Sequence, residues 1–118
     1  VYGTGNLTTL NPSQMANHLG YKTGICTTGN SLDNVEKDDE LMKENDASVK
    51  DIEAAAIAWV SNMNQVPYLG VKVVTDLVDG GVSTQEEVLA NLSSAAESLQ
   101  NSLPKVLEYL CDKTEQEL

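Results

Sequence analysis

The sequence has 118 residues and a mass of 12.7 kDa, which is room for a single domain. Eighteen Asp and Glu against seven Lys and Arg give a formal net charge of −11, which disfavours binding to nucleic acid or anionic lipid because both need cationic side chains. Hydrophobic residues make up 41 % of the chain without a run near the ~20 residues that span a bilayer, so we expect a folded core and no membrane span.

The start of the chain and its two cysteines bear on where the protein works. Residue 1 is Val and no basic-then-apolar leader follows it, so we expect no targeting peptide here. The start is a processed end, a boundary or the interior of a longer chain. Cys26 and Cys111 lie far apart and form no CxxC or Cys/His spacing. A disulfide between them is one alternative, and two reduced, buried thiols in a cytosolic protein are the favoured one.

The first part of the chain predicts a short helix, a strand and an acidic segment. Asn11-Pro12-Ser13 is typical of a helix start, and Gly20 predicts the end of that helix. Residues 23–28 (Thr-Gly-Ile-Cys-Thr-Thr) have the composition of a strand, which Gly29-Asn30 ends. In the acidic residues 35–45 we expect a solvated loop with a short helix.

The middle and end of the chain predict a buried helix, a central strand and a long final helix. Residues 50–64 carry apolar side chains at helical spacing. Residues 66–75 form a β-branched run that is the best candidate for a central strand. Residues 84–87 (Thr-Gln-Glu-Glu) are a capping box that starts the final helix. An apolar stripe carries that helix onward, and Pro104 should kink or restart it.

The order helix, strand, helix, strand, helix predicts an α/β fold with a parallel sheet. Two strands are too few for a doubly wound sheet, which usually has about five or more. Residues 7–10 could add an edge strand, but not the three that are missing. The sequence therefore predicts half of a fold.

Asp76 is the first candidate for chemistry. It follows the predicted central strand, at the carboxyl end where open α/β sheets place their ligand crevices. The run Val-Lys-Val-Val at 71–74 before it would bury the base of that position. Desolvation can raise the pKa of a carboxyl group there, which suits a general acid near neutral pH. The competing interpretation, favoured by position alone, is an Asp that caps the turn into residues 77–79.

Asp51 and Glu53 lie at the amino end of the predicted buried helix. Residues two apart do not share a helix face, so they form no carboxylate dyad by simple helical geometry. By position alone, their charges stabilise the helix dipole. The functional alternative is that Glu53 points into the crevice and accepts hydrogen bonds from a polyol such as ribose.

Three other motifs give weaker signals. Residues 27–31 (Thr-Thr-Gly-Asn-Ser) match neither GxGxxG nor a Walker pattern, so a plain turn is favoured over a phosphate cradle. His18 is the single histidine and has no partner for a hydrolytic triad or a zinc site. The acidic run of residues 36–40 lacks EF-hand spacing and is expected to be a solvated face.

Three motifs in order carry a family resemblance: Thr-Gly-Asn-Ser-Leu-Asp at 28–33, Val-Lys-Asp-Ile-Glu-Ala-Ala-Ala at 49–56 and Val-Thr-Asp-Leu-Val-Asp-Gly at 74–80. Together they resemble the carboxyl-terminal half of the plant-type 5′-methylthioadenosine/S-adenosylhomocysteine nucleosidases, in the nucleoside phosphorylase superfamily. The resemblance extends from residues 2–5 to the final helix. It implies a three-layer αβα fold, of which residues 1–118 supply roughly the second half as part of one domain.

The resemblance also implies an activity, the hydrolysis of the N-glycosidic bond of methylthioadenosine, or of S-adenosylhomocysteine, with release of adenine in methionine salvage. Asp76 would be the general acid that protonates the purine, and Thr75 would help to position it. Glu53 would hold the ribose hydroxyls, Ile52 would pack under the ribose, and Leu32 would cover the purine. A carboxylate near the sugar and an acid at the leaving group suit an oxocarbenium-like transition state, and no metal or organic cofactor is implied.

The match to the family pattern has departures and implies partners. Asn30 stands where the family usually has Asp, and Ile52 where it usually has Met. The glycine-rich first strand and the glutamate that activates water belong to the family's amino-terminal half, so the resemblance implies a partner segment that supplies them, and a homodimer. Two alternatives stay open. A non-catalytic storage-type relative should lose Asp76 and Glu53, and a phosphorylase would need phosphate-binding arginines that these motifs lack.

Overall fold

Helix α1 (Ser13–Leu19) forms where the sequence signals place it. The computed structural model describes residues 5–33, 35–77 and 84–118. In it, the Asn11 Oδ1 atom accepts hydrogen bonds from the amide and the hydroxyl of Ser13, at 3.1 and 2.6 Å. Gly20 ends the helix in the left-handed region (φ 73°), and its N–H donates to the Ala16 carbonyl. Both ends of α1 therefore agree with the prediction.

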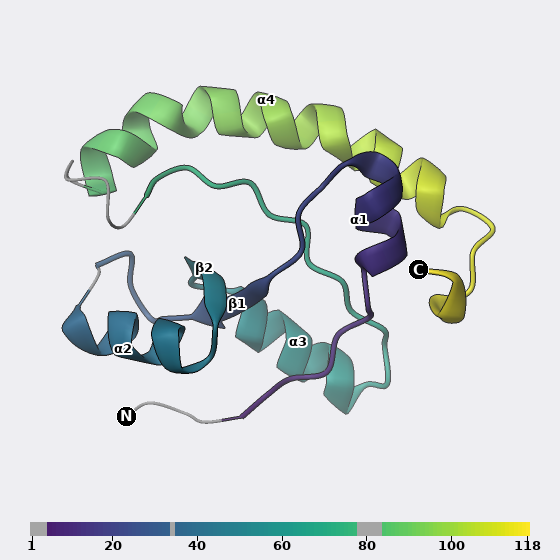
Figure 1. The fold of residues 1–118 in the computed structure, drawn as a ribbon, viewed down its shortest axis with the longest axis horizontal. Coiled ribbons are helices and arrows are strands. Elements are labelled where there is room, and N and C mark those ends of the chain that lie inside the picture. Colours follow the sequence, from purple (N-terminus) through teal and green to yellow (C-terminus); the bar gives the residue numbers. More distant parts are fainter. Residues whose placement is uncertain (1–4, 34, 78–83) are drawn as a thin grey trace.

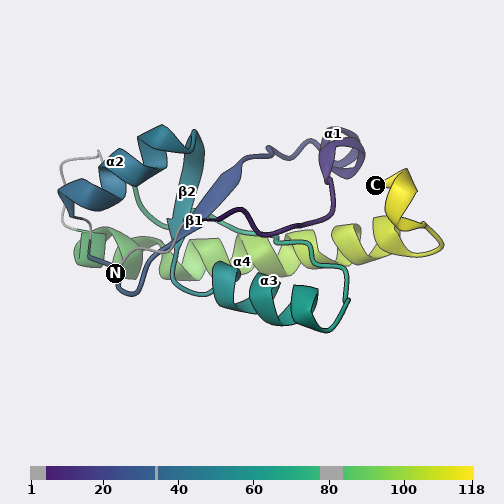
Figure 2. The same cartoon turned by 90° about the horizontal axis from the view of Figure 1, so that it is seen from below.

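The sheet of the described residues consists of two parallel strands, β1 (Ile25–Thr28) and β2 (Ala47–Asp51). Helix α2 (Glu36–Glu44) lies between them in the chain. Thr28 pairs with Asp51 in the ladder, so the carboxyl ends of both strands meet at one edge. In both views of the fold, the two strands lie between α2 and α3 (Ala54–Met63) (Figures 1 and 2). The predicted parallel sheet is confirmed.

The second strand is not the predicted one. Lys50 and Asp51, which the helical spacing assigned to the buried helix, belong to β2 and pair with Thr27 and Thr28 of β1. The helix begins only at Ala54. Residues 66–75 run as a thread beside α4 (Thr84–Leu110) without forming a strand (Figure 1). In the part of the chain that the structure describes, no strand pairs with this thread, and β-branched residues cannot form a ladder without a paired strand.

The sequence predicted a kink or a restart at Pro104, and of these the restart is wrong, because α4 continues through Pro104 as one helix. Proline removes one backbone donor, and the turns on either side keep their own bonds, which is enough to carry a long helix across the defect. A 3₁₀ turn, η1 (Glu115–Glu117), follows. The Met15 N–H donates to the Leu118 carbonyl at 3.0 Å, so the last residue is attached to α1.

The core is small and lies mainly where α1 meets α4. The buried apolar side chains are Met15, Ala16, Ala58, Ala95, Val106 and Leu118. Large apolar side chains on α3 and α4 lie uncovered, and Trp59, Met63 and Leu89 are 62 %, 73 % and 75 % exposed. The radius of gyration is 15.3 Å, against roughly 13.5 Å for a compact domain of this length. None of the described helices combines the length and the apolarity that crossing a membrane requires.

Candidate functional site

Asp51 is the centre of a polar cluster at the carboxyl edge of the two strands. Its side chain is only 10 % exposed. The Oδ1 atom accepts a hydrogen bond from the Thr28 hydroxyl at 2.7 Å, and Oδ2 accepts one from the Ala54 amide at 3.0 Å. The Lys72 ammonium forms an ion pair with the same Oδ2. The Asp51 carboxylate therefore connects β1, the start of α3 and the thread of residues 66–75.

Thr28, at the end of the neighbouring strand β1, binds a backbone amide in the first turn of α3. Its hydroxyl oxygen accepts a hydrogen bond from the Ala55 amide at 2.9 Å while the hydroxyl donates to Asp51. The first amides of a helix have no partner within the helix, and here two of them are satisfied by strand-end side chains. The helix that follows β2 is thus fixed to the sheet edge, and with it the position of Glu53.

Lys72 places a positive charge between two carboxylates. Its Nζ atom lies 3.7 Å from the Glu53 Oε2 atom and also pairs with Asp51. Partial burial tends to lower the pKa of Lys72, but its hydrogen bond to Asp51 and the charges of Asp51 and Glu53 outweigh burial and raise this pKa above its usual value. Glu53 itself is more than half exposed and precedes the first turn of α3. The cluster is therefore a fixed ammonium beside an accessible carboxylate.

The charge of Asp51 is stabilised in the same way. Burial tends to raise the pKa of Asp51, but the hydrogen bonds from Lys72 and Thr28 and the charge of Lys72 outweigh burial and lower it. The neighbouring thiol responds in the opposite direction, because burial and then the negative charge of Asp51 raise the pKa of Cys26 to about 11. Cys26 is accordingly protonated near neutral pH, which is the unreactive form of a thiol.

Asp76 directly follows the thread of residues 66–75. Hydrogen bonds from Thr75 and from side chains of α4 hold this part of the chain. The Thr75 hydroxyl donates to the Asp76 Oδ1 atom at 2.7 Å. The Asn91 side-chain amide donates to the Thr75 carbonyl oxygen at 2.8 Å, and the Leu77 amide donates to the Glu87 carboxylate at 3.2 Å. Helix α4 therefore holds the backbone on both sides of Asp76. The side chain of Asp76 is half-buried.

The remaining predicted residues lie after the two strand ends. Leu32 follows β1 and is 60 % exposed, and Ile52 follows β2 and is 39 % exposed. Among the described residues, no hydrogen bond or ion pair connects Asp76 with Glu53. Their roles toward a substrate, together with that of Thr75, stay predictions.

Two lysines of the site were not identified from the sequence. Lys72 is the single charged residue in the run Val-Lys-Val-Val at 71–74, and a lone charge in an apolar run was the available signal for a buried ion pair. Lys50, described further below, gave no such signal because it lies next to Asp51 in a segment that was assigned to a helix.

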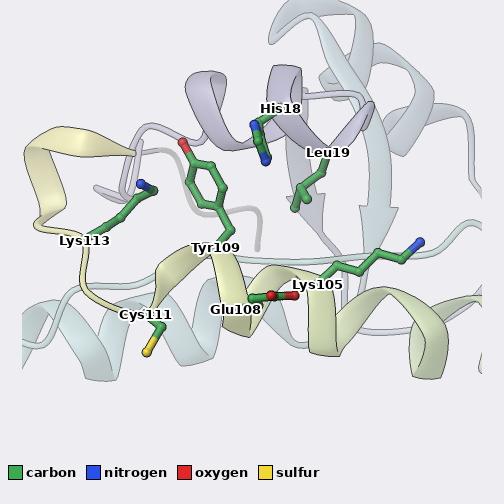
Figure 3. Close-up of a pocket in the computed structure, with 7 residues that line it drawn as sticks. All are labelled: His18, Leu19, Lys105, Glu108, Tyr109, Cys111 and Lys113. Atoms are coloured by element: carbon green, nitrogen blue, oxygen red, sulfur yellow. The ribbon is translucent and has the colours of Figure 1, made fainter.

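One hollow of the described surface lies away from these residues. It has a volume of about 550 Å³ and lies between α1 and the end of α4, where its lining residues are His18, Leu19, Lys105, Glu108, Tyr109, Cys111 and Lys113 (Figure 3). The ring centroids of His18 and Tyr109 are 5.1 Å apart, and the Lys113 Nζ atom lies 4.8 Å from the Tyr109 ring centroid. None of the predicted site residues lines this hollow. No group of three His, Cys, Asp or Glu side chains in the described residues could hold a metal ion.

Comparison with known proteins adds to this geometry. A family profile described as "Phosphorylase superfamily" matches residues 13–108. Over 113 residues the chain is 40 % identical to an Arabidopsis thaliana "5′-methylthioadenosine/S-adenosylhomocysteine nucleosidase", covering 96 % of this chain and 44 % of the relative. An Arabidopsis thaliana "5′-methylthioadenosine nucleosidase" is 37 % identical over 93 % of this chain and 41 % of its own length.

Solved structures agree with the sequence matches. A structure of "the MTA/SAH nucleosidase" superimposes with a TM-score of 0.87 at 39 % identity, and covers 93 % of this chain. The apo form of the Arabidopsis thaliana 5′-methylthioadenosine nucleosidase gives a TM-score of 0.88 at 35 % identity. In both comparisons the chain spans 45 % of the solved chain, so it corresponds to less than half of these relatives. The fold, the parallel strands and the profile match over residues 13–108 together mean that this chain belongs to the phosphorylase superfamily.

Proposed function

We propose that this chain is the carboxyl-terminal part of a nucleosidase domain that hydrolyses the N-glycosidic bond of 5′-methylthioadenosine and releases adenine. The observation that carries the proposal is that the two carboxylates of the family motifs are both held by neighbouring groups, Asp76 by the Thr75 hydroxyl and Glu53 beside the Lys72 ammonium. The 40 % identity to an Arabidopsis nucleosidase supports it. A storage-type relative should lack both carboxylates, and both are present here.

The geometry suits an acid at the leaving group. Because the Thr75 hydroxyl donates to Oδ1 of Asp76 and no bond from another described residue reaches Oδ2, we assign the proton of the acid to Oδ2. Its transfer to a purine ring nitrogen neutralises the charge that the departing adenine would otherwise carry, and a positioned acid of this kind contributes typically about 10²–10⁴-fold to a rate. The water molecule then supplies the hydroxyl group to the anomeric carbon, and the proton it loses goes to a base outside this chain.

Glu53 would act on the sugar. A carboxylate accepts hydrogen bonds from ribose hydroxyls and stabilises the positive charge that develops on the ring as the bond breaks. The Lys72 Nζ atom lies 3.7 Å from the Glu53 Oε2 atom, so the two side chains attract each other beside the sheet edge that holds Asp51. Ile52 and Leu32, both partly exposed beside the strand ends, would supply the apolar surfaces under the ribose and over the purine.

Partners and location follow from the same proposal. The relatives are more than twice as long as the matched segment, and the apolar faces of α3 and α4 lie uncovered. We propose that an amino-terminal segment of the same enzyme covers part of this surface and supplies the base for water, and that the completed enzyme forms a homodimer. The two free cysteines, Cys26 and Cys111, are typical of a reducing compartment and support a cytoplasmic location.

The test uses a completed enzyme, in which this chain follows the amino-terminal part of the Arabidopsis relative that it matches at 40 % identity. Adenine release from methylthioadenosine is measured together with substrate affinity. We expect Asp76→Asn to lower turnover at least ~10²-fold with little loss of affinity, because the acidic proton is removed and the substrate contacts stay. Glu53→Gln should lower both, because a charge-assisted acceptor is lost in the ground state and in the transition state.

The control is Asp112→Asn, an exposed carboxylate after the end of α4, which should leave turnover unchanged. Wild-type turnover in the Asp76→Asn variant would show that another group is the acid. A folded completed enzyme that releases no adenine would refute the proposed function as a whole.

A further inference from the structure

Lys50 is a nearly buried lysine that the chemistry described above does not use. Its side chain extends from β2 and is 11 % exposed. The ammonium donates to the Asp33 carbonyl oxygen at 2.8 Å and to the Asp38 Oδ2 atom at 2.7 Å. Asp38, in the first turn of α2, is itself only 16 % exposed and also accepts a hydrogen bond from the Val35 amide. Lysine is rarely buried unless it is paired. The ion pair with Asp38 therefore keeps the Lys50 ammonium in one place, next to the Asp33 carbonyl that it binds.

The stem of Lys50 passes directly over Gly29. A Cβ atom at Gly29 would lie 2.8 Å from the Lys50 Cε atom, closer than real Cβ contacts come. The absence of a side chain at this position is therefore what lets the lysine reach across. The Gly29 amide also donates to the Asp51 carbonyl oxygen at 2.8 Å. The turn of residues 29–33 is thus attached to β2 at both ends, through Gly29 to the backbone and through Asp33 to Lys50.

Leu32 lies inside this turn and has little packing of its own, since 60 % of its surface is exposed. Its position therefore depends on the backbone that carries it. Without the ammonium, the Asp33 carbonyl would lose this partner, and the Asp38 carboxylate would lose its counter-ion in a poorly solvated place. The turn would then be attached to β2 at the Gly29 end alone.

We propose that Lys50 is a positioning residue that holds the turn of residues 29–33, and with it Leu32, in the place where the turn covers a purine. The inference rests on the proposed function for the identity of the ligand, and on the contacts of Lys50 for the mechanism. The polar contacts of Lys50 in the described residues are with Asp33 and Asp38 and not with Glu53 or Asp76, so its effect falls on purine affinity and not on the chemical step.

The experiment compares Lys50→Met with wild type in the completed enzyme. Methionine keeps most of the stem and removes the charge. If the competent position of the turn falls to about a tenth of the population, apparent purine affinity falls by the same factor. We therefore expect the dissociation constant of adenine, measured by calorimetry, and the KM for methylthioadenosine to rise roughly tenfold together. Turnover should stay within about threefold, and inhibition by methylthioribose, which lacks the purine, should not change.

Two further variants separate positioning from general damage. Asp38→Asn removes the charge on α2 that pairs with Lys50. The substitution can affect purine binding only by changing the position of Lys50, so it should weaken adenine binding as Lys50→Met does. Lys37→Met removes the exposed pair with Glu40, whose atoms lie 2.9 Å apart, and should leave adenine binding unchanged. Backbone hydrogen exchange of residues 29–33 should become faster in Lys50→Met, while β2 exchanges as in wild type.

Unchanged adenine binding in Lys50→Met and Asp38→Asn would overturn the inference. Faster exchange of the turn with unchanged adenine binding would also overturn it, because the turn would then be held by Lys50 without covering the purine. Adenine binding is measured without turnover. A wild-type enzyme that binds adenine but hydrolyses no methylthioadenosine would therefore refute the proposed function and leave the role of Lys50 to be decided by the same titrations.

Discussion

Replacement of Asp51 by Asn removes a charge while it keeps the size of the side chain, and its cost can be worked out from the contacts. Asn can still accept the Thr28 hydroxyl bond, but its amide nitrogen cannot accept the Ala54 N–H or pair with Lys72. The lost helix-start bond costs about 1 kcal/mol. The lost pair adds about 1–2 kcal/mol, near the low end for charged hydrogen bonds because the Lys72 side chain is 40 % exposed. We expect the free energy of unfolding to fall by about 2–3 kcal/mol.

Urea denaturation of the completed enzyme measures this loss. The matched control is Glu40→Gln, which also breaks a carboxylate–lysine pair, with Lys37, but one in which the Glu40 side chain is 54 % exposed. That variant should cost less than about 0.5 kcal/mol, because solvent screens exposed pairs. Equal losses for the two variants would refute the argument that burial and the helix-start bond make Asp51 important.

The pH dependence gives a second check on the same carboxylate. Its pKa is lowered in the folded state from an ordinary value of 3.8. The stability that it contributes is therefore fully present above about pH 4 and is lost as the pH falls through the lowered folded pKa. The difference between wild type and Asp51→Asn should be constant near neutral pH and shrink below about pH 4. A difference that persists unchanged into strong acid would indicate packing, not charge, as its cause.

Two further predictions concern Cys26 and Gly20. Cys26 should react with iodoacetamide at pH 8 at least about tenfold more slowly than Cys111, as measured by mass spectrometry of the alkylated protein. Cys26 is half-buried and its pKa of about 11 leaves little thiolate, whereas Cys111 is exposed. Equal rates would contradict the described surroundings of Cys26. Gly20→Ala should lower the free energy of unfolding by about 1 kcal/mol, because φ is 73° there although an added Cβ meets no atom within 4 Å. Gly70→Ala, at a glycine outside the left-handed region, should cost less in the same denaturation assay, and equal costs would argue against backbone strain.

Local signals predicted the elements whose stability is local. Pro12 and Gly20 mark both ends of α1, and the strand ending near Thr28 was placed correctly, because caps and turns depend on a few adjacent residues. The same logic failed for β2. Residues 47–51 are short and mixed in polarity, and Asp51 before an alanine-rich run resembles a charge at a helix start. Its carboxylate does accept the Ala54 amide, so the inference about the charge was sound while the boundary was wrong.

The thread of residues 66–75 shows the opposite failure. Its β-branched run has the composition of a central strand, but a strand forms only by hydrogen-bonding to another strand, and no strand of the described residues pairs with it. The site residues also divide into those that sequence motifs identified and those that only contacts distant in the sequence revealed. Asp76 and Glu53 could be proposed from the motifs of a family. Lys72 and Lys50 form contacts across 19 and 12 residues of sequence, to Glu53 and Asp38. The lone charge of Lys72 in an apolar run could signal an ion pair, but no pattern in a single sequence names the partner of either lysine.

The hydrogen bond from Asn91 to the Thr75 carbonyl has a consequence for how the protein can be produced. Asn91-Leu92-Ser93 is an N-glycosylation sequon, and the sugar is attached to the same Nδ2 atom that donates this bond. A glycan there would have to share the space beside Thr75 or turn the amide away from it, one residue before Asp76. Occupancy of this sequon in a eukaryotic secretory pathway would therefore disturb the hydrogen bond that holds the Thr75 backbone next to Asp76. A bacterial host, or Asn91→Gln in a secreted form, keeps a donor at this position free of sugar.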